Sequence, residues 1–220
     1  MIVTIDGPAG SGKSSTAKKV AERIGWNYLD SGALYRTWTL LYVMGGMDKD
    51  YFLDVAGVHK VTLSVNEKGT GTEPLLNGEK VGDEIRQPII SSNVSAVAAM
   101  GPVRDKVNEE MRRIVQEHHF IADGRDLGSV VFPDAALKFY MVADLGERAK
   151  RRYEELKSKG MEVSLEEISR NLADRDAQDS GRDIAPLTRP EGSVEIDTTA
   201  MDFDEQVSFI SGLINEKLTG

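Results

Sequence analysis

The stretch Gly7-Pro8-Ala9-Gly10-Ser11-Gly12-Lys13-Ser14 fits the phosphate-loop pattern G-x-x-x-x-G-K-[ST]. It follows the apolar run Ile2-Val3-Thr4-Ile5 directly and opens a helix-compatible segment from Ser14 to Gly25. This context matters because the loop works only between a strand and a helix N-terminus, where glycines let successive N–H groups surround an anion. Lys13 can then reach β- and γ-phosphate oxygens, and the Ser14 hydroxyl can ligate Mg²⁺. A glycine-rich turn that only caps a helix is the weaker alternative, because the whole motif and both flanks are present.

Composition limits the classes of function that the chain can have. Its 220 residues are enough for one core that carries sizeable insertions. The formal net charge of -9, without a sustained basic run, argues against a nucleic-acid partner. Cysteine is absent, which excludes disulfides and thiolate metal sites. Because the sequence shows no secretion signal and no apolar stretch of about 20 residues, we expect a cytoplasmic protein with no membrane partner.

Short apolar runs alternate with helix-like segments, a rhythm typical of an α/β fold with a parallel sheet. The predicted strands are Ile2–Ile5, Asn27–Leu29, Phe120–Ala122, Leu137–Met141 and Val194–Ile196. The predicted helices are Lys13–Ile24, Gly32–Met44, Gly146–Lys159, Leu165–Asp176 and Phe203–Leu218. The segment from Lys60 to Val81 breaks the rhythm, because it combines alternating strands with turn signals such as Asn77-Gly78. We therefore expect a small antiparallel insertion in an otherwise parallel domain.

Two further motifs follow predicted strands, at the carboxyl ends where open α/β sheets bind ligands. In Asp30-Ser31-Gly32-Ala33-Leu34-Tyr35-Arg36, the arginine either grips a second phosphate group or is simply an exposed helix residue, and the motif alone does not decide. In Asp123-Gly124-Arg125-Asp126-Leu127-Gly128-Ser129, the first carboxylate is placed to serve Mg²⁺ indirectly. Two carboxylates around an arginine also make a surface ion-pair turn, although the two glycines favour a shaped loop.

Arginines recur at helical spacing in the second half of the chain. Arg148, Arg151 and Arg152 share one helix face, and Arg175, Asp179 and Arg182 share another if their helix continues through Gly181. For any single arginine, pairing with a neighbouring carboxylate is the commoner outcome. For the two clusters together we favour a phosphate ligand, because guanidinium groups bind its oxygens bidentately.

Taken together, these motifs resemble the bacterial-type cytidylate (CMP) kinases, a family of nucleoside monophosphate kinases. The resemblance runs nearly from end to end, through residues 5–14, 28–36, 77–79, 84–86, 94–99, 102–104, 123–135, 175–176, 179–180, 182, 186–187 and 197–199. The phosphate loop is shared by many unrelated nucleotide-binding proteins. The blocks GRDLGSVVFPDA (124–135) and RDAQDSGRDIAPL (175–187) are far more specific.

The resemblance implies a P-loop nucleoside monophosphate kinase fold, in which helices flank a parallel sheet that carries a small antiparallel insertion and a helical lid. Residues 1–220 would form a single domain, with the monophosphate-binding insertion at about 36–104 and the lid at about 148–182. The implied activity is ATP- and Mg²⁺-dependent phosphorylation of CMP and dCMP to CDP and dCDP. A monomer is the default expectation for its assembly.

The resemblance also implies roles for single residues. Asp126 would accept a hydrogen bond from the cytosine amino group, Arg104 would donate to the acceptor edge, and Ser95 would face the same base. The implied catalytic residues are Lys13, Arg125, Arg175 and Arg182, and Ser14 would ligate the metal. The implied ATP-binding residues are Gly7, Pro8, Ala9, Gly10, Ser11, Gly12, Lys13, Ser14 and Ser15. The implied CMP-binding residues are Ser31, Arg36, Ser95, Arg104, Arg125, Asp126, Arg175, Asp179 and Arg182.

Two other classes of protein share the phosphate loop. A nucleotide-switched regulatory module should carry a base-specificity signature such as N-K-x-D, which the sequence lacks. A kinase of another small metabolite, such as a pantothenate-derived or shikimate-type substrate, would share the core and the lid. It would have no reason for the long antiparallel insertion or for the set Ser95, Arg104 and Asp126.

Overall fold

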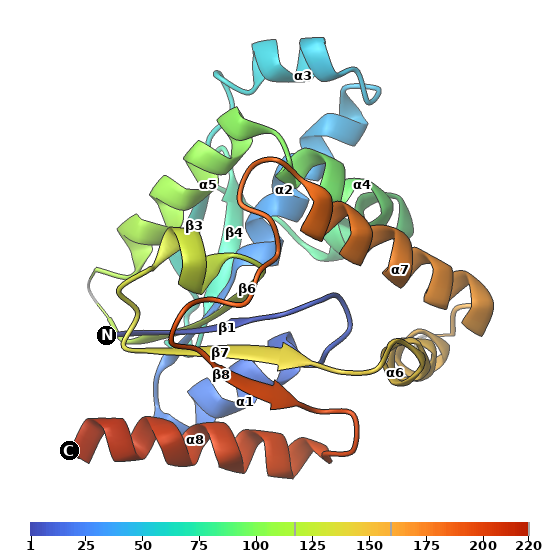
Figure 1. Ribbon diagram of the computed structural model, residues 1–220. Coiled ribbons are helices and arrows are strands. Elements are labelled where there is room, and N and C mark those ends of the chain that lie inside the picture. The colour runs from blue at the N-terminus through green and yellow to red at the C-terminus, as the bar shows by residue number, and fades with distance from the viewer. Residues whose placement is uncertain (117, 159, 220) are drawn as a thin grey trace.

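The computed structural model describes residues 1–116, 118–158 and 160–219, and a five-stranded parallel sheet in the order β2-β6-β1-β7-β8 forms its centre (Figure 1). The strands are β1 (Ile2–Asp6), β2 (Asn27–Asp30), β6 (Phe120–Gly124), β7 (Leu137–Val142) and β8 (Val194–Asp197). Each strand predicted from the sequence is present and runs one or two residues further at its carboxyl end. The predicted α/β class with a parallel sheet is therefore confirmed.

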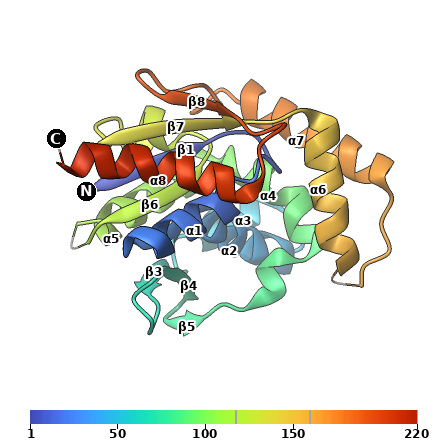
Figure 2. The same cartoon turned by 90° about the horizontal axis from the view of Figure 1, so that it is seen from below.

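Helices cover both faces of this sheet. Helices α1 (Lys13–Ile24) and α8 (Phe203–Thr219) pack on one face, and α2 (Ser31–Met44) and α5 (Gly101–Ile114) pack on the other (Figures 1 and 2). The first apolar core includes Val3, Ile5, Val20, Phe139 and Ile210, and the second includes Leu34, Trp38, Val107, Met111 and Phe120. Alternate residues of the central strands enter opposite cores, as the two-residue period of a strand requires.

The predicted insertion is a separate antiparallel sheet of three strands within the described part of the chain. It consists of β3 (Val61–Val65), β4 (Thr72–Leu76) and β5 (Glu79–Lys80), and Asn77-Gly78 makes the last turn with positive φ at both residues. It follows α3 (Lys49–Val55) and precedes the short 3₁₀ turn η1 (Asp83–Arg86). The β3–β4 turn lies against the free edge of β2, where the Tyr28 N–H donates to the Thr70 carbonyl at 3.3 Å.

The remaining helices surround the carboxyl ends of the strands. They are α4 (Pro88–Ala98), α6 (Leu145–Ser158) and α7 (Leu165–Gly181), and a π-helical turn, η2 (Leu127–Val131), follows β6. Lys159, the predicted last residue of one helix, lies outside the described residues. The prediction that this helix ends at Asp176 is wrong, because α7 continues to Gly181 and Arg182 is its C-cap residue. Helices α3, α4 and α5 were not predicted.

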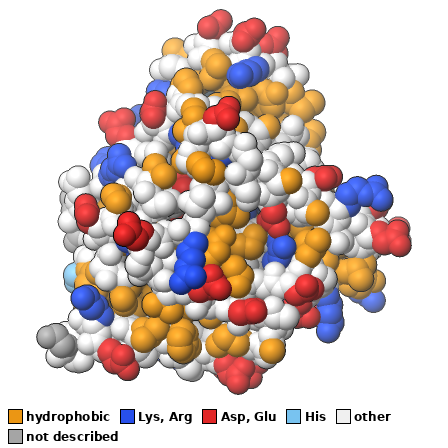
Figure 3. All heavy atoms as spheres, in the orientation of Figure 1, with side chains coloured by type: hydrophobic (Ala, Val, Ile, Leu, Met, Phe, Trp, Pro, Cys, Tyr) orange, Lys and Arg blue, Asp and Glu red, His pale blue; other side chains and the backbone are white. Residues whose placement is uncertain are grey.

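Charges are mixed over the molecular face shown in Figure 3, where acidic and basic side chains lie next to each other. Among the described residues, every helix is too short or too polar to cross a membrane.

Candidate active site

The phosphate loop connects β1 to α1, as the sequence predicted. Gly7 has φ of 153°, and a side chain there would collide with the Met141 carbonyl oxygen on neighbouring β7. Gly12 caps α1 in the left-handed region with φ of 90°. Both positions therefore need glycine, and the loop that they shape presents the N-terminus of α1 to a cavity of about 690 Å³.

Lys13 is buried at the start of α1, and its ammonium group donates to the Pro8 carbonyl at 3.0 Å. Burial, followed by the charge of Arg125, lowers the pKa of Lys13 to about 7. Asp123 and Asp179 oppose this lowering but do not cancel the effect of burial and the two arginines Arg125 and Arg175. A polyphosphate in the cavity would supply a counter-charge and favour the protonated amine.

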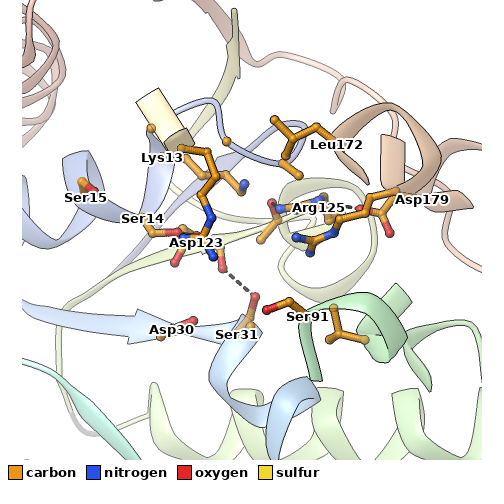
Figure 4. Close-up of a pocket in the computed structure, with 18 of the residues that line it drawn as sticks. Lys13, Ser14, Ser15, Asp30, Ser31, Ser91, Asp123, Arg125, Leu172 and Asp179 are labelled. Carbon is orange, nitrogen blue, oxygen red and sulfur yellow. Dashed lines mark hydrogen bonds and ion pairs between the residues drawn. The ribbon is translucent and has the colours of Figure 1, made fainter. Parts of the chain in front are cut away.

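Asp123 is the last but one residue of β6 and lies beside Ser14. The Ser14 hydroxyl donates to one carboxylate oxygen at 2.5 Å, and the Tyr28 hydroxyl donates to the other at 2.6 Å. Ser31 donates to the Asp123 carbonyl at 2.6 Å, which ties the start of α2 to the same residue (Figure 4). Burial is the main cause of the raised pKa of Asp123, while Lys13 and the two hydroxyl donors oppose it. The carboxylate is thus fixed in place and short of positive charge.

Arginines face the phosphate loop from the far side of the cavity. Arg125 donates through Nε to Asp179 at 2.8 Å, and both residues lie across the cavity from Lys13 (Figure 4). Burial opposes ionisation of Asp179, yet Arg125 and then Arg175 hold its pKa below the usual value. Among the described residues, the buried Nε of Arg175 has no hydrogen-bond partner, and burial together with Arg125 lowers the pKa of Arg175 to about 10. A partly buried guanidinium at the cavity with an unused donor is suited to binding an anion.

Asp126 lies between two arginines at another wall of the cavity. Its carboxylate accepts from Arg104 on one oxygen and from Arg182 at 2.9 Å on the other, and all three side chains are at least 95 % buried. Arg104 also donates to the Ala98 carbonyl at 3.0 Å and stacks over the Tyr35 ring at 5.7 Å. The carboxylate of Asp126 keeps lone pairs free for a further donor, because a carboxylate accepts up to about four hydrogen bonds.

The turn that carries Asp126 is fixed by a buried carboxylate of β1. The Leu127 and Gly128 N–H groups donate to the two oxygens of Asp6 at 2.9 and 2.7 Å. Asp6 has no exposed surface, and burial raises its pKa to about 7 in spite of these two bonds. The position of Asp126 therefore depends on a residue of the adjacent strand.

Most of the residues predicted for the site line this one cavity, although they come from distant parts of the sequence. Those that line it are Ala9, Gly10, Gly12, Lys13, Ser14, Ser15, Ser31, Arg36, Ser95, Arg125, Asp126, Arg175, Asp179 and Arg182. Those that do not line it are Gly7, Pro8, Ser11 and Arg104. Arg36 lies 3.9 Å from the Asp30 carboxylate and reaches the cavity with its side chain about a quarter exposed.

The arginine face of α6 is not directed at the cavity as a unit. Arg148 is buried against Asp176, and Arg151 donates to Glu147 at 3.0 Å and to the Thr198 carbonyl at 2.7 Å. Arg152 pairs with Glu155 at 2.6 Å. All three arginines therefore form ion pairs with carboxylates of the protein. Arg151 and Arg152 also border the cavity.

Two residues that support the cavity from behind, and four that border it, could not be identified from the sequence. Tyr28 and Asp6 do not line the cavity, but they bind Asp123 and the turn after Asp126, and neither spacing nor residue type indicated these partners. Four residues just before and in the first turn of α8 also border the cavity, namely Met201, Asp202, Phe203 and Gln206. Only the fold brings that segment beside the phosphate loop, where Gln206 accepts from Thr16 at 3.0 Å.

The phosphate loop lies between the central strand and α1, and Lys13, Arg125, Arg175 and Arg182 line the cavity in front of it. Together with the parallel sheet, this site defines the protein as a P-loop kinase. The chain belongs to the cytidylate kinase family, whose sequence profile matches residues 3–216. It is 43% identical over 221 residues to the cytidylate kinase of Caldanaerobacter subterraneus, covering 99% of this chain and 96% of that protein. It is 43% identical over 216 residues to the cytidylate kinase of Fervidobacterium nodosum, covering 98% and 96% of the two chains.

A solved structure of an uncharacterized protein from Eubacterium ventriosum has a similar fold. Its TM-score is 0.51 at 13% identity, and the match covers 98% of each chain. At this identity the likeness concerns the fold alone.

Proposed function

We propose that this protein transfers the γ-phosphoryl group of ATP to CMP and dCMP. The observation that carries the proposal is Asp126, a buried carboxylate at the cavity wall that is held by two arginines and retains unused acceptor capacity. A carboxylate in this setting selects a ligand that brings an N–H donor, as the amino group of cytosine does. Uracil has a carbonyl in that place and would set an acceptor against a buried carboxylate, which disfavours it.

The donor nucleotide belongs at the phosphate loop. The N–H groups at the start of α1 and the ammonium of Lys13 would bind the β- and γ-phosphates, with Gly7 to Ser15 forming the cradle. The pKa of Lys13 supports this proposal. Burial and Arg125 lower that pKa in the free protein, and a bound phosphate would favour the protonated amine.

Magnesium fits the oxygen donors at this position. Ser14 and Asp123 offer one hydroxyl and one carboxylate, both hard oxygen ligands of the kind that Mg²⁺ prefers. Among the described residues, no group of three or more His, Cys, Asp or Glu side chains could hold a metal ion by itself. We therefore propose that Mg²⁺ arrives with the ATP phosphates, and that Ser14 ligates it while Asp123 orients the hydroxyl. When bound, the ion would neutralise charge on the transferring phosphoryl group.

The transfer needs positioning and charge neutralisation more than covalent chemistry. We propose that Arg125, Arg175 and Arg182 bind the phosphates of the two nucleotides, with Arg36 on the acceptor phosphate. Ser31 and Asp179 would contact the acceptor phosphate or sugar. The unpartnered Nε of Arg175 supports this assignment, since a bound phosphate would satisfy it. No side chain is proposed as a nucleophile.

The base would be read at the wall formed by Ser95 on α4 and Asp126. Arg104 lies behind Asp126, and we propose that it reaches the acceptor edge of cytosine from there. We also propose that residues of about 36–104 act as the monophosphate-binding region and that about 148–182 act as a lid. Closure of that lid would exclude water and prevent hydrolysis of ATP. The working unit is proposed to be a monomer.

A substrate panel tests this function directly. Rates with ATP and CMP, dCMP, UMP or AMP should favour the two cytidine nucleotides in the wild-type enzyme. A preference for AMP or UMP would refute the proposal.

The variant Asp126→Asn tests how the base is read. Its amide presents either an oxygen or a nitrogen to the base, so the efficiency with CMP should fall and the gap to UMP should narrow. A site that requires a hydrogen bond discriminates by ~10⁴-fold or more, so partial relaxation is measurable. Because the substitution also weakens the contacts to Arg104 and Arg182, its thermal unfolding is measured alongside. An equal loss with every substrate in a folded variant would show that Asp126 positions the loop and does not read the base.

A further inference from the structure

The backbone of Ala9, inside the phosphate loop, is bound on both sides by residues of the α6–α7 helices. Its N–H donates to Asp176 on α7 at 3.1 Å, and its carbonyl accepts from Arg148 on α6 at 2.8 Å. The same Arg148 nitrogen donates to the second Asp176 oxygen at 2.7 Å. Arg148 is itself anchored at the start of α6, where Nε donates to the Ala143 carbonyl at 3.0 Å.

This contact is buried and well packed. The Arg148 side chain is 8% exposed and the Asp176 side chain is 23% exposed. Ala9 belongs to a small apolar cluster with Ala149, Ile168 and Leu172 of the two helices. Next to it, a Cβ at Gly10 would already touch Arg148 and Leu172 at 3.4 to 3.5 Å. The α6–α7 helices therefore form the outer wall of the phosphate loop, and Figure 1 shows both helices on the side of the sheet to which the loop after β1 turns.

The chemistry of the pair suits a loop that must receive phosphates. An unpaired carboxylate beside the loop would repel ATP, and an unpaired arginine would compete with the protein for its phosphates. Arg148 and Asp176 form an ion pair with no net charge, so the pair can hold one backbone donor and one backbone acceptor without adding a net charge beside the loop. The Ala9 N–H is used in its hydrogen bond to Asp176, so the backbone of the loop is fixed at this residue.

We propose that Arg148 and Asp176 are positioning residues that hold the phosphate loop in its nucleotide-binding form through the backbone of Ala9. They act on ATP without touching it, which explains why an arginine of α6 faces away from the cavity. The inference rests on the proposed function for the identity of the nucleotide at the loop.

The test uses the full chain with Asp176→Ala and Asp176→Asn. Asp176→Ala removes both hydrogen bonds, and it should raise the KM for ATP about tenfold while leaving the KM for CMP nearly unchanged. Asp176→Asn keeps an acceptor for the Ala9 N–H but loses the charge that holds Arg148, so its effect should be smaller and in the same direction. The matched control is Glu195→Gln on β8. It removes an exposed ion pair with Arg189 and should change neither the KM for ATP nor the KM for CMP.

Two readouts do not depend on the acceptor. Amide hydrogen exchange should show the Ala9 N–H protected in the nucleotide-free wild type and exposed in Asp176→Ala. Calorimetric binding of a non-hydrolysable ATP analogue with Mg²⁺ should weaken by the same factor as the KM for ATP. If the wild type failed to phosphorylate CMP while these two results held, the proposed acceptor would be wrong and the positioning role would stand.

Two results would overturn the inference. One is an Ala9 N–H that exchanges equally fast in wild type and variants. The other is a parallel rise in the KM for ATP and for CMP, which would indicate general loosening of the fold. Thermal unfolding shows whether Asp176→Ala is folded. If it is unfolded, the milder variants Asp176→Asn and Arg148→Lys are measured instead, and the same two results would overturn the inference.

Discussion

The buried carboxylate of Asp6 should leave a measurable pH dependence in the stability of the protein. Asp6 lies on the central strand with no exposed surface, and burial raises its pKa from 3.8 to about 7. The folded state therefore keeps a proton on Asp6 up to about pH 7, whereas the unfolded chain releases it near pH 3.8. Between these values the native state binds more protons than the unfolded state, so the free energy of unfolding falls as pH rises.

The size of the effect follows from the two pKa values. The full contribution is present below pH 3.8 and is lost as pH rises through 7, and the difference corresponds to about 4 kcal/mol. In Asp6→Asn this titration is absent. The asparagine offers one oxygen to the two N–H groups of Leu127 and Gly128, which costs roughly 1–3 kcal/mol at every pH. At low pH the variant should therefore have a lower free energy of unfolding than the wild type. As pH rises towards 8 the wild type loses stability and the variant does not, so this difference should shrink and then reverse.

The assay is urea unfolding of both proteins from pH 4.5 to 8.5, with Asp134→Asn as a control for losing one exposed carboxylate. The difference in free energy of unfolding between wild type and Asp6→Asn should change by several kcal/mol across this range. A difference that stays constant with pH would show that Asp6 is ionised throughout, and the reasoning from its burial would fail. Because Asp6 holds the turn after Asp126, the same variant should also raise the KM for CMP.

Three further substitutions separate the roles proposed within the cavity. Lys13→Ala should abolish turnover with ATP and CMP, and near-normal rates would refute the assignment of the phosphate loop. Its free energy of unfolding should not fall, because the substitution removes a buried amine whose charge is costly to bury. Arg182→Ala should lower kcat by about 10²- to 10³-fold, against less than tenfold for Arg151→Ala, and equal small losses would mark both as structural ion pairs. Tyr28→Phe removes the 2.6 Å hydrogen bond to Asp123 and should raise the Mg²⁺ concentration for half-maximal rate about tenfold, whereas an unchanged requirement would exclude that role.

The parallel sheet could be predicted because its central strands β1 and β6 are buried on both faces. A strand covered by helices on each side reads as a short apolar run, and each predicted strand was followed by a helical pattern or a recognisable loop. The antiparallel insertion was also predictable, since Asn77-Gly78 needs positive φ at both positions and gets it in the structure.

The helices that were missed carry signals that usually indicate loops. Helix α5 begins with Gly101-Pro102, a pair that reads as a turn, but proline is well tolerated in the first turn of a helix because its N–H is not needed there. Helix α4 contains Ser91, Ser92 and Asn93, which are poor helix formers, and two of them bond back to carbonyls one turn earlier. Packing against α2 and α5 overrides these local preferences.

What the sequence could not show was which cation meets which anion. Helical spacing placed Arg148, Arg151 and Arg152 on one face, but it did not say what that face would contact. The fold turns Arg148 towards Asp176, 28 residues away, and leaves Arg175 with an unused buried donor at the cavity. Arg148 is thus paired away from the cavity, whereas Arg175 keeps a buried donor with no hydrogen-bond partner among the described residues, and helical spacing does not distinguish the two. That distinction depends on tertiary contacts, so it can be drawn from the structure and not from spacing.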